Sequence, residues 1–219
     1  MIRESTLLKS IPGIRHAFGT KSENLPKTFE DSWNSSKPHW KQVHGKTSCE
    51  IIAVQQDCGE ADAVWTIQPK VPIAVVSADC VPILMARSDG KAIAAIHSGW
   101  RGTLADISGE LARRFGEDLS SWTAAIGPAI GPCCYQVSEE LALDFLSRFS
   151  DLSKQEVLPS PRMLDLPRLV EHALKRSGIG EVELLRACTR CSRDADGYVY
   201  ESFRRDRKGS REFSIIEIV

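Results

Sequence analysis

The stretch from Glu50 to His97 most constrains the fold, because it is a series of short apolar segments. They read EIIAVQQ, ADAVWT, PIAVVSA, PILMAR and KAIAAIH, with Gly, Pro or Asp residues between them. Segments of this kind are typical of strands. Residues 73–76 and 93–96 are apolar at every position, which suits central strands covered on both faces. The stretch therefore predicts a sheet that is buried on both sides.

Helices are expected after this stretch. Apolar residues in 103–115 recur with a helical period, and Gly116 follows as a C-terminal glycine would. Ser138 and Asp165 are expected to cap two further helices, the second ending before Gly178. Strands return at EVELL, around residues 198–203 and at EFSIIEIV. We found no repeat or linker, and residues 21–41 are expected to be a surface loop. The pattern predicts one α+β domain over residues 1–219.

The composition excludes several classes of partner. Of the 219 residues 42% are hydrophobic and 26% charged, and the net charge is −1, which is typical of a soluble globular protein. This balance predicts neither a nucleic-acid nor a membrane partner. The cluster of basic residues in 204–211 is interpreted as a solvated turn between strands. No apolar run has the length of a signal peptide or a membrane span, so a cytoplasmic location is expected.

The seven cysteines are irregularly spaced. An odd number in a reducing compartment favours free thiols with metal or catalytic roles over disulfides. Cys188 and Cys191 form a CxxC pair, but no second CxxC exists to complete a four-cysteine site. We therefore interpret them as an incidental thiol pair. Cys133 and Cys134 are expected to pack near the active site without binding a metal.

Three short motifs place reactive side chains at the ends of predicted strands. They are Gln42–Gly45, Ser77–Cys80 and His97–Thr103. His44, Cys80 and His97 together offer two imidazoles and a thiolate, a set that suits a catalytic Zn²⁺ with one position open. Asp79 is a candidate catalytic proton carrier, or a partner that orients a metal-binding histidine.

The third motif also has the features of a phosphate site. A glycine-flanked turn that enters a helix leaves backbone N–H groups free, and Arg101 adds a cationic fork. The same residues also fit an ordinary capped helix start with Arg101 in a surface ion pair. The residues predicted to contact substrate are Ser98, Arg101, Gly102 and Thr103.

These motifs occur in the order found in one known family. QVHGK, ADAVWT, SADCVPILMA, AAIHSGWRGT, IGPAIGPCCYQV, Cys188-Thr189 and SFRRDRKGSR resemble the YfiH-type family, also called the laccase-domain or multicopper polyphenol oxidase family. The resemblance implies mixed β-sheets sandwiched between helical layers, as in the catalytic domain of cytotoxic necrotizing factor toxins. It implies that His44, Cys80 and His97 bind the metal, with Zn²⁺ expected and copper as the alternative.

The resemblance also implies a function. Family members are associated with purine nucleoside phosphorylase, adenosine deaminase and methylthioadenosine phosphorylase activities. The expected partners are therefore a small-molecule nucleoside and phosphate, and the chain is expected to be a monomer or a weak homo-oligomer. The first forty residues depart from the family, since they are shortened and Lys21 stands where an Arg is common. Lys cannot reproduce a bidentate contact, so substrate binding by this region is in question.

Three alternatives remain at this stage. A copper-dependent polyphenol oxidase would need more histidines than the five present. An amide hydrolase would use Cys80 as a nucleophile activated by His97, without a metal. A zinc-stabilised binding module would unfold on chelation and turn over no substrate.

Overall fold

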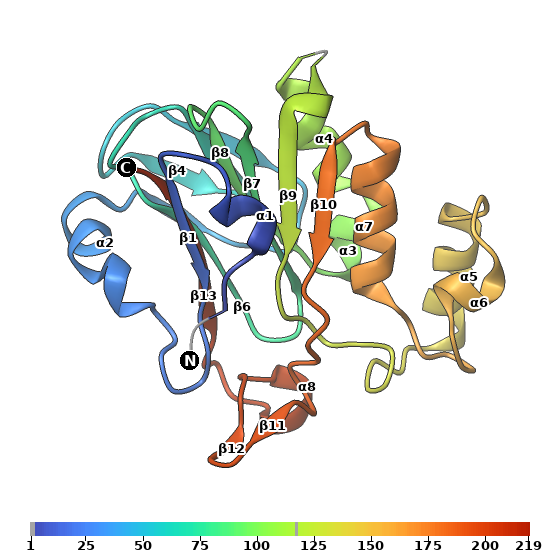
Figure 1. Cartoon of the computed structure of the whole chain (residues 1–219). Helices are drawn as coiled ribbons and strands as arrows, with labels where there is room; N and C mark the ends of the chain where they lie inside the picture. Colours follow the sequence, from blue (N-terminus) through green and yellow to red (C-terminus); the bar gives the residue numbers. More distant parts are fainter. Residues whose placement is uncertain (1–2, 117) are drawn as a thin grey trace.

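The centre of the fold is a six-stranded mixed sheet in the order β10-β9-β7-β8-β5-β3, of which β7, β8, β9 and β10 can be followed in Figure 1. The computed structural model describes residues 3–116 and 118–219. In chain order, the strands of this sheet are β3 (Ser48–Ile51), β5 (Ala63–Thr66), β7 (Val81–Arg87), β8 (Ile93–Ser98), β9 (Trp122–Ile126) and β10 (Glu181–Leu184). β7 is antiparallel to both β8 and β9, whereas β10 runs parallel to β9.

A three-stranded antiparallel sheet packs on one face of the six-stranded sheet. Its order is β1-β13-β6, with bounds Ile14–Phe18, Glu212–Ile218 and Ile73–Ser77. β6 and β13 both contact β8 across the interface. Consecutive strands β6 and β7 thus belong to different sheets, and the short turn Ala78–Cys80 carries the chain from one sheet to the other.

Helices cover the outer faces of the two sheets (Figure 1). On the six-stranded sheet these are α3 (Trp100–Leu104), α4 (Ile107–Arg114) and α7 (Leu166–Arg176). α2 (Glu30–Ser36) lies outside the three-stranded sheet, and its Trp33 packs with Phe29 against Ile215 of β13. The expected arrangement of mixed sheets between helical layers is confirmed.

The remaining elements are, apart from α5, seven residues long or shorter. They are α1 (Thr6–Lys9), η1 (Lys27–Phe29), β2 (His39–Lys41), β4 (Asp57–Glu60), η2 (Leu119–Ser121), α5 (Glu139–Arg148), α6 (Lys154–Val157), β11 (Arg193–Asp194), β12 (Gly197–Tyr198) and α8 (Phe203–Asp206). β2 pairs with β4, and β11 pairs with β12, as two small separate sheets. None of the helices within residues 3–116 and 118–219 has the length and apolar composition needed to cross a bilayer.

The alternation of side chains along β8 explains why residues 93–96 are apolar at every position. Ala94 and Ile96 belong to the core under the helices, and Ile93 and Ala95 belong to the core between the sheets. Successive strand residues point to opposite faces, so a strand covered on both sides needs apolar residues at every position. The prediction for residues 93–96 is confirmed. β6 is also buried but lies at the edge of its sheet, not at the centre as predicted.

The helix predictions have mixed outcomes. α5 and α7 are confirmed, and Ser138 and Asp165 accept hydrogen bonds from backbone N–H groups in their first turns. The single helix expected over residues 103–115 is wrong. Asp106 adopts a left-handed conformation (φ +57°), and its side chain caps α4 by accepting a hydrogen bond from Gly109 N–H. A side chain that caps a new helix start in this way divides the segment into α3 and α4.

Three other predictions need correction. Residues 21–41 are not simply a loop, because η1, α2 and β2 form there and bury aromatic side chains. The strand expected over 198–203 is limited to β12, since Ser202 caps α8 by accepting from Arg205 N–H. Cys49 and Cys58 are joined in a disulfide between β3 and β4, against the preference for free thiols. They are 9 positions apart in sequence, and only the folded chain brings their Cα atoms within 6.0 Å.

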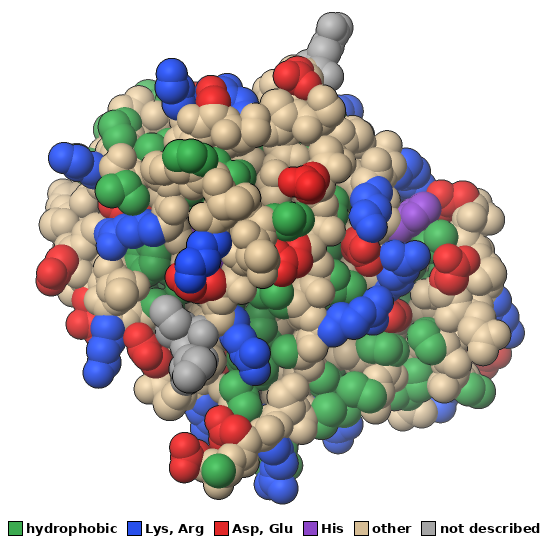
Figure 2. Space-filling model, viewed as in Figure 1, with side chains coloured by type: hydrophobic (Ala, Val, Ile, Leu, Met, Phe, Trp, Pro, Cys, Tyr) green, Lys and Arg blue, Asp and Glu red, His purple; other side chains and the backbone are tan. Residues whose placement is uncertain are grey.

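The charged side chains of the surface are mixed in sign. On the face seen in Figure 2, Lys and Arg side chains lie among Asp and Glu side chains. This distribution agrees with the net charge of −1. It gives that face no broad field of one sign to attract a polyanion.

The core between the sheets predicts a large effect of truncating Phe18. Its ring is fully buried in that core, on strand β1. We expect Phe18→Ala to lower the free energy of unfolding by about 3–5 kcal/mol, because it leaves a cavity between two rigid sheets. Leu143→Ala is the control, because Leu143 is 60% exposed on α5. Urea unfolding, followed by two spectroscopic probes, measures the free energy of unfolding of both variants. An equal loss of stability in the two variants would contradict the packing of Phe18 described here.

Candidate metal centre

His44, Cys80 and His97 come together from three separate parts of the chain. His44 lies between β2 and β3, Cys80 in the turn between β6 and β7, and His97 near the end of β8. One donor atom from each lies within 4.8 Å of the other two. The Cys80 Sγ and His44 Nδ1 atoms are 3.9 Å apart, and the two imidazole ring centroids are 4.8 Å apart. The predicted grouping of these residues is thus present in the structure.

Asp62 holds His97 in place. Its Oδ1 atom is 2.8 Å from His97 Nδ1, and both side chains are almost fully buried. The sheet register explains the contact: Ala63 of β5 pairs with Ile96 of β8, so the preceding Asp62 lies beside the following His97. A carboxylate on Nδ1 fixes the tautomer and leaves Nε2 of His97 available to a metal.

The same carboxylate also fixes the loop that carries His44. The backbone N–H groups of Val43, His44 and Gly45 donate to the Asp62 oxygens at 3.2, 2.9 and 2.7 Å. His44 itself has a left-handed backbone (φ +60°), which is uncommon for a residue with a side chain and has to be stabilised by its surroundings. Gln42 completes the support, because its side-chain amide forms two 2.8 Å hydrogen bonds with the backbone of Val76 in β6.

Cys80 is presented by the turn that links the two sheets. Asp79 in this turn has φ +94°, and its carboxylate accepts hydrogen bonds from Thr189 Oγ1 at 2.7 Å and Arg204 N–H at 2.6 Å. Asp79 therefore anchors the turn to the C-terminal part of the chain, and Asp62, not Asp79, orients a histidine of the group. Gly99 lies against this group: a Cβ atom there would be 3.0 Å from Cys80 Sγ. A larger residue at position 99 would press on the sulfur.

The electrostatics of the group favour a charged Cys80–His97 pair in the metal-free protein. Burial alone raises the pKa of Cys80, but hydrogen bonds and charge from His44 and His97 outweigh it and bring the pKa down to about 7. Burial alone lowers the pKa of His97, but Asp62 and Cys80 outweigh it and raise the pKa to about 9. Burial likewise raises the pKa of Asp62, and hydrogen bonds from His97 and Gly45 bring it below its usual value.

The group lies in the wall of a cavity of about 700 Å³. Besides His44, Cys80, His97 and Asp79, the lining is rich in aromatic and basic side chains. These are Trp33, Lys37, His39, Trp40, Trp100, Tyr135, Phe203, Arg204, Arg211 and Phe213. Cavities of this size with apolar walls and a few convergent polar groups are typical of small-molecule sites.

The four residues predicted to contact substrate are not among the residues that line the cavity. Ser98 Oγ and Thr103 Oγ1 are buried and 2.9 Å apart, and Thr103 also donates to the Gly99 carbonyl at 3.0 Å. Gly102 is buried against the carbonyl of Gly45. Arg101 is exposed, with its guanidinium 4.4 Å from the ring centroid of Trp100. Their roles as substrate contacts stay a prediction.

Sequence reasoning missed the cavity residues from both ends of the chain. Lys37 comes from the segment expected as a loop, whereas Lys21 is not among the lining residues. The basic cluster is a solvated turn only in part. Arg207 and Lys208 are exposed, but Arg204 lines the cavity, and Arg205 donates to the carbonyls of Thr189, Arg190 and Tyr200. The signal in the sequence that could have predicted this part of the cavity is the group of arginines between Phe203 and Phe213.

Asp62 was missed as well. It lies within the ADAVWT motif but had no predicted role, although a carboxylate at the start of an apolar strand needs a partner when it is buried.

The donor set of two imidazoles and one thiolate, with Asp62 behind His97, fits a zinc ion with an open position. Three protein ligands are the usual number for a catalytic zinc site.

Comparison with known proteins supports the resemblance seen in the motifs. The family model described as multi-copper polyphenol oxidoreductase laccase matches residues 23–218. Purine nucleoside phosphorylase YfiH of Escherichia coli (strain K12) is 30% identical over 199 residues, which are 90% of this chain and 80% of the relative.

Solved structures show the same fold. The crystal structure of a Neisseria meningitidis protein superposes with a TM-score of 0.82 at 20% identity, covering 100% of this chain and 98% of that one. The crystal structure of the Bacillus licheniformis hypothetical protein YfiH gives a TM-score of 0.80 at 23% identity, covering 94% and 93%. With its motifs, its fold and its match over residues 23–218 in agreement, this chain belongs to the multi-copper polyphenol oxidoreductase laccase family, also known as the YfiH-type family.

Proposed function

We propose that this protein is a zinc-dependent purine nucleoside phosphorylase. The observation that carries the proposal is the His44–Cys80–His97 group, held by Asp62, in the wall of a cavity with aromatic and basic residues. The E. coli relative is named purine nucleoside phosphorylase, which supports the same reaction here. The expected products are a free purine base and ribose 1-phosphate, or methylthioribose 1-phosphate from methylthioadenosine.

The cavity offers contacts for both substrates. The aromatic rings of Trp33, Trp100 and Phe213 line the cavity, and aromatic rings of this kind can stack with a purine base. Lys37 and Arg211 supply positive charge for a phosphate within the same cavity. We favour these two residues over Arg101 as the phosphate contacts, because Arg101 is not among the residues that line the cavity.

The reaction joins a phosphate oxygen to the anomeric carbon of the ribose while the bond from that carbon to the purine nitrogen breaks. The base leaves with the electron pair of that bond and takes up a proton. A zinc ion held by His44, Cys80 and His97 would supply Lewis-acid chemistry. Asp62 keeps His97 in the tautomer that binds a metal, and the hydrogen bonds of Asp79 orient its carboxylate as a candidate proton carrier at the cavity wall.

We include adenosine deamination in the proposal. That reaction replaces the amino group of the purine by oxygen from water and releases ammonia. It needs a bound purine and a metal of the kind proposed here, as in known zinc deaminases. The two reactions differ in their need for phosphate, which separates them experimentally.

A copper oxidase is a weaker candidate despite the family name. Of the five histidines, all of them in the described parts of the chain, only His44 and His97 belong to the metal group. His16 accepts a hydrogen bond from Ser5 N–H, and His172 is paired with Asp151. A single group of this kind lacks the ligands for several copper ions.

A Cys–His hydrolase is the second candidate, because one observation favours it. In the metal-free protein the pKa of Cys80 is about 7 and that of His97 about 9, which favours a thiolate beside an imidazolium. Such a pair is the usual activated nucleophile of thiol hydrolases. His44 has no necessary part in that mechanism, so it distinguishes the two candidates.

The reaction products test the proposed function directly. We expect adenosine incubated with the zinc-loaded protein to give adenine only when phosphate is present, and inosine with or without phosphate. Chromatography of the products, with ribose 1-phosphate measured in parallel, identifies each reaction. If zinc-loaded protein at high concentration forms neither adenine nor inosine, the proposal is wrong.

Replacing His44 tests the dependence on a metal. We expect His44→Ala to lower kcat/KM by more than the roughly 10–100-fold lost with an outer partner of a metal site, because it removes a direct ligand. His172→Ala is the matched control, since His172 pairs with Asp151 on the protein surface. Zinc affinity is measured with a competing chelator and activity by product formation. Activity that survives in His44→Ala but is lost on alkylation of Cys80 would favour the thiol mechanism.

The pKa of His97 predicts how zinc binding depends on pH. A proton on His97 opposes metal binding, so zinc affinity should rise with pH up to about 9 and be flat above it. Below about 7 the rise should be steeper, because Cys80 also holds its proton there. In Asp62→Asn the carboxylate that raises the pKa of His97 is gone, so the rise should end at a lower pH.

Competition titrations over this pH range measure the profile, with Asp89→Asn as a surface control. A merely structural role of Asp62 would lower zinc affinity by the same factor at every pH. An unshifted profile in Asp62→Asn would therefore contradict the role assigned to this carboxylate.

A further inference from the structure

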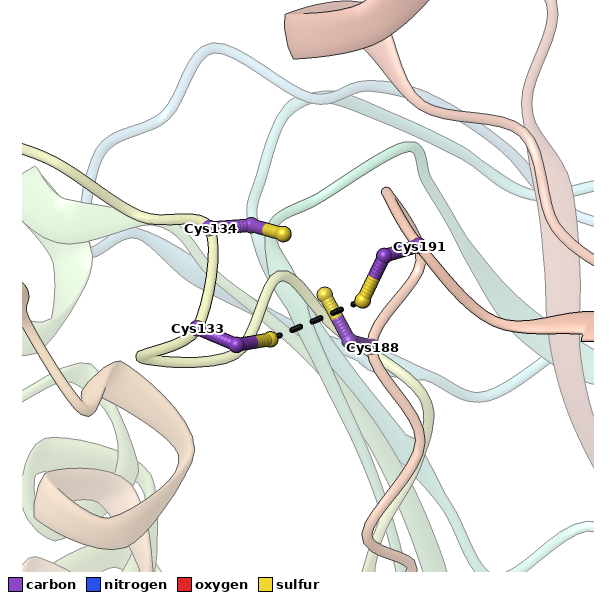
Figure 3. Close-up of side chains that lie close together, drawn as sticks. All are labelled: Cys133, Cys134, Cys188 and Cys191. Atoms are coloured by element: carbon purple, nitrogen blue, oxygen red, sulfur yellow. Dashed lines mark hydrogen bonds between the residues drawn. The ribbon is translucent and has the colours of Figure 1, made fainter.

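Four cysteines that were not expected to form a site come together outside the cavity. The CxxC pair Cys188 and Cys191 lacks a second CxxC in sequence, but in the structure the adjacent pair Cys133 and Cys134 faces it. Figure 3 shows the two pairs on neighbouring turns, with their sulfur atoms directed toward a common centre. All four Sγ atoms lie within 4.8 Å of one another, and those of Cys133 and Cys191 are 3.6 Å apart.

We propose that Cys133, Cys134, Cys188 and Cys191 bind a second metal ion, a structural Zn²⁺ in a tetrahedral four-thiolate site. Four thiolates fill the coordination of zinc and leave no position for a substrate, which distinguishes this site from the His44–Cys80–His97 group. The proposal does not depend on the reaction that the cavity performs.

The spacing of the sulfur atoms fits one ion. Zinc–sulfur bonds of about 2.3 Å in a tetrahedron place the sulfurs about 3.8 Å apart. The observed 3.6 Å between Cys133 and Cys191 is close to this edge, and no pair exceeds 4.8 Å. An iron–sulfur cluster would hold some of the four sulfurs farther apart, because they would bind at least two different iron atoms. The four thiols are free in the structure, and the 3.6 Å between the Cys133 and Cys191 sulfurs is well beyond a disulfide bond of about 2.05 Å.

The backbone around the cysteines favours bound thiolates. Gly131 N–H points at Cys188 Sγ at 3.3 Å, and a hydrogen bond to sulfur stabilises its charged form. Each cysteine pair lies on a tight turn. The N–H groups of Cys134 and Tyr135 both donate to the Gly131 carbonyl at 2.9 and 3.0 Å, and Ser192 N–H donates to the Cys188 carbonyl at 2.9 Å. Each turn thus holds two of the four cysteines close to each other.

The position of the site suggests its role. The two turns lie beyond β9 and β10, which are parallel neighbours, and Thr189 N–H donates to the Ala129 carbonyl between them. Tyr135 next to one turn lines the cavity, and Thr189 within the other holds Asp79. An ion bound by all four cysteines would therefore fasten together two loops that support the cavity wall.

The metal content of two variants tests this site apart from the cavity. Cys80→Ser removes a ligand of the first group, so we expect this variant, purified with zinc and a reductant, to retain about one zinc per chain. Adding Cys133→Ser and Cys191→Ser should remove nearly all of that zinc. Both cysteines are exposed, so serine there leaves no cavity in the core. Elemental analysis per folded chain gives the ratio, and circular dichroism checks the fold.

Cobalt substitution of the Cys80→Ser protein is a second measurement that needs no cluster variant. Binding by four thiolates should give strong sulfur-to-cobalt charge-transfer absorption together with the visible bands of tetrahedral cobalt. The proposal is overturned if Cys80→Ser contains no zinc and gives no such spectrum. It is also overturned if the variant that combines Cys80→Ser, Cys133→Ser and Cys191→Ser retains the zinc. A disulfide between Cys133 and Cys191 in protein purified with the reductant would overturn it as well.

Discussion

The buried carboxylate of Asp62 is the interaction on which the rest of the site depends. It accepts the ring N–H of His97 and three backbone N–H groups from Val43 to Gly45. An ionised carboxylate without partners would be very costly to bury, and these four donors offset that cost. Because the same two oxygens serve β8 and the His44 loop, the two imidazoles keep their relative position without help from a metal.

The stacking of two sheets determines where this site lies. β6 and β7 follow one another in the chain but belong to different sheets, so Cys80 lies in a turn at the seam between them. Strand alternation directs His97 toward the same seam, opposite to the helix-covered face of Ile96. The apolar character of residues 93–96 follows from the burial of β8 on both faces. The strand ends in two buried polar residues: His97 is paired with Asp62, and Ser98 with Thr103.

The ends of the chain complete the cavity. α2 supplies Trp33 near the N-terminus, and the segment around α8 supplies Arg204 and Phe203 near the C-terminus. These segments meet because β1 pairs with β13 in the three-stranded sheet. Much of the aromatic and basic lining of the cavity therefore comes from parts of the sequence that carry no candidate metal ligand, although Trp100 belongs to the same motif as His97.

The sequence by itself determined the buried strand over residues 93–96, the two capped helices and the three candidate ligands. The apolar run of 93–96 and the caps Ser138 and Asp165 depend on local chemistry, so they were predictable. Strand partners are not encoded locally, so the role of Asp62 could be assigned only once β5 was seen beside β8.

Only the tertiary structure decided which distant residues meet. It joined Cys49 to Cys58, and it brought Cys133 and Cys134 to Cys188 and Cys191, although no spacing in the sequence relates these pairs. It also brought residues from segments near both ends of the chain into the lining of the cavity. The candidate ligands can be identified from short motifs, because the residues of each motif are neighbours in the sequence. A site built by contacts between strands depends on sheet order, which the core as a whole determines.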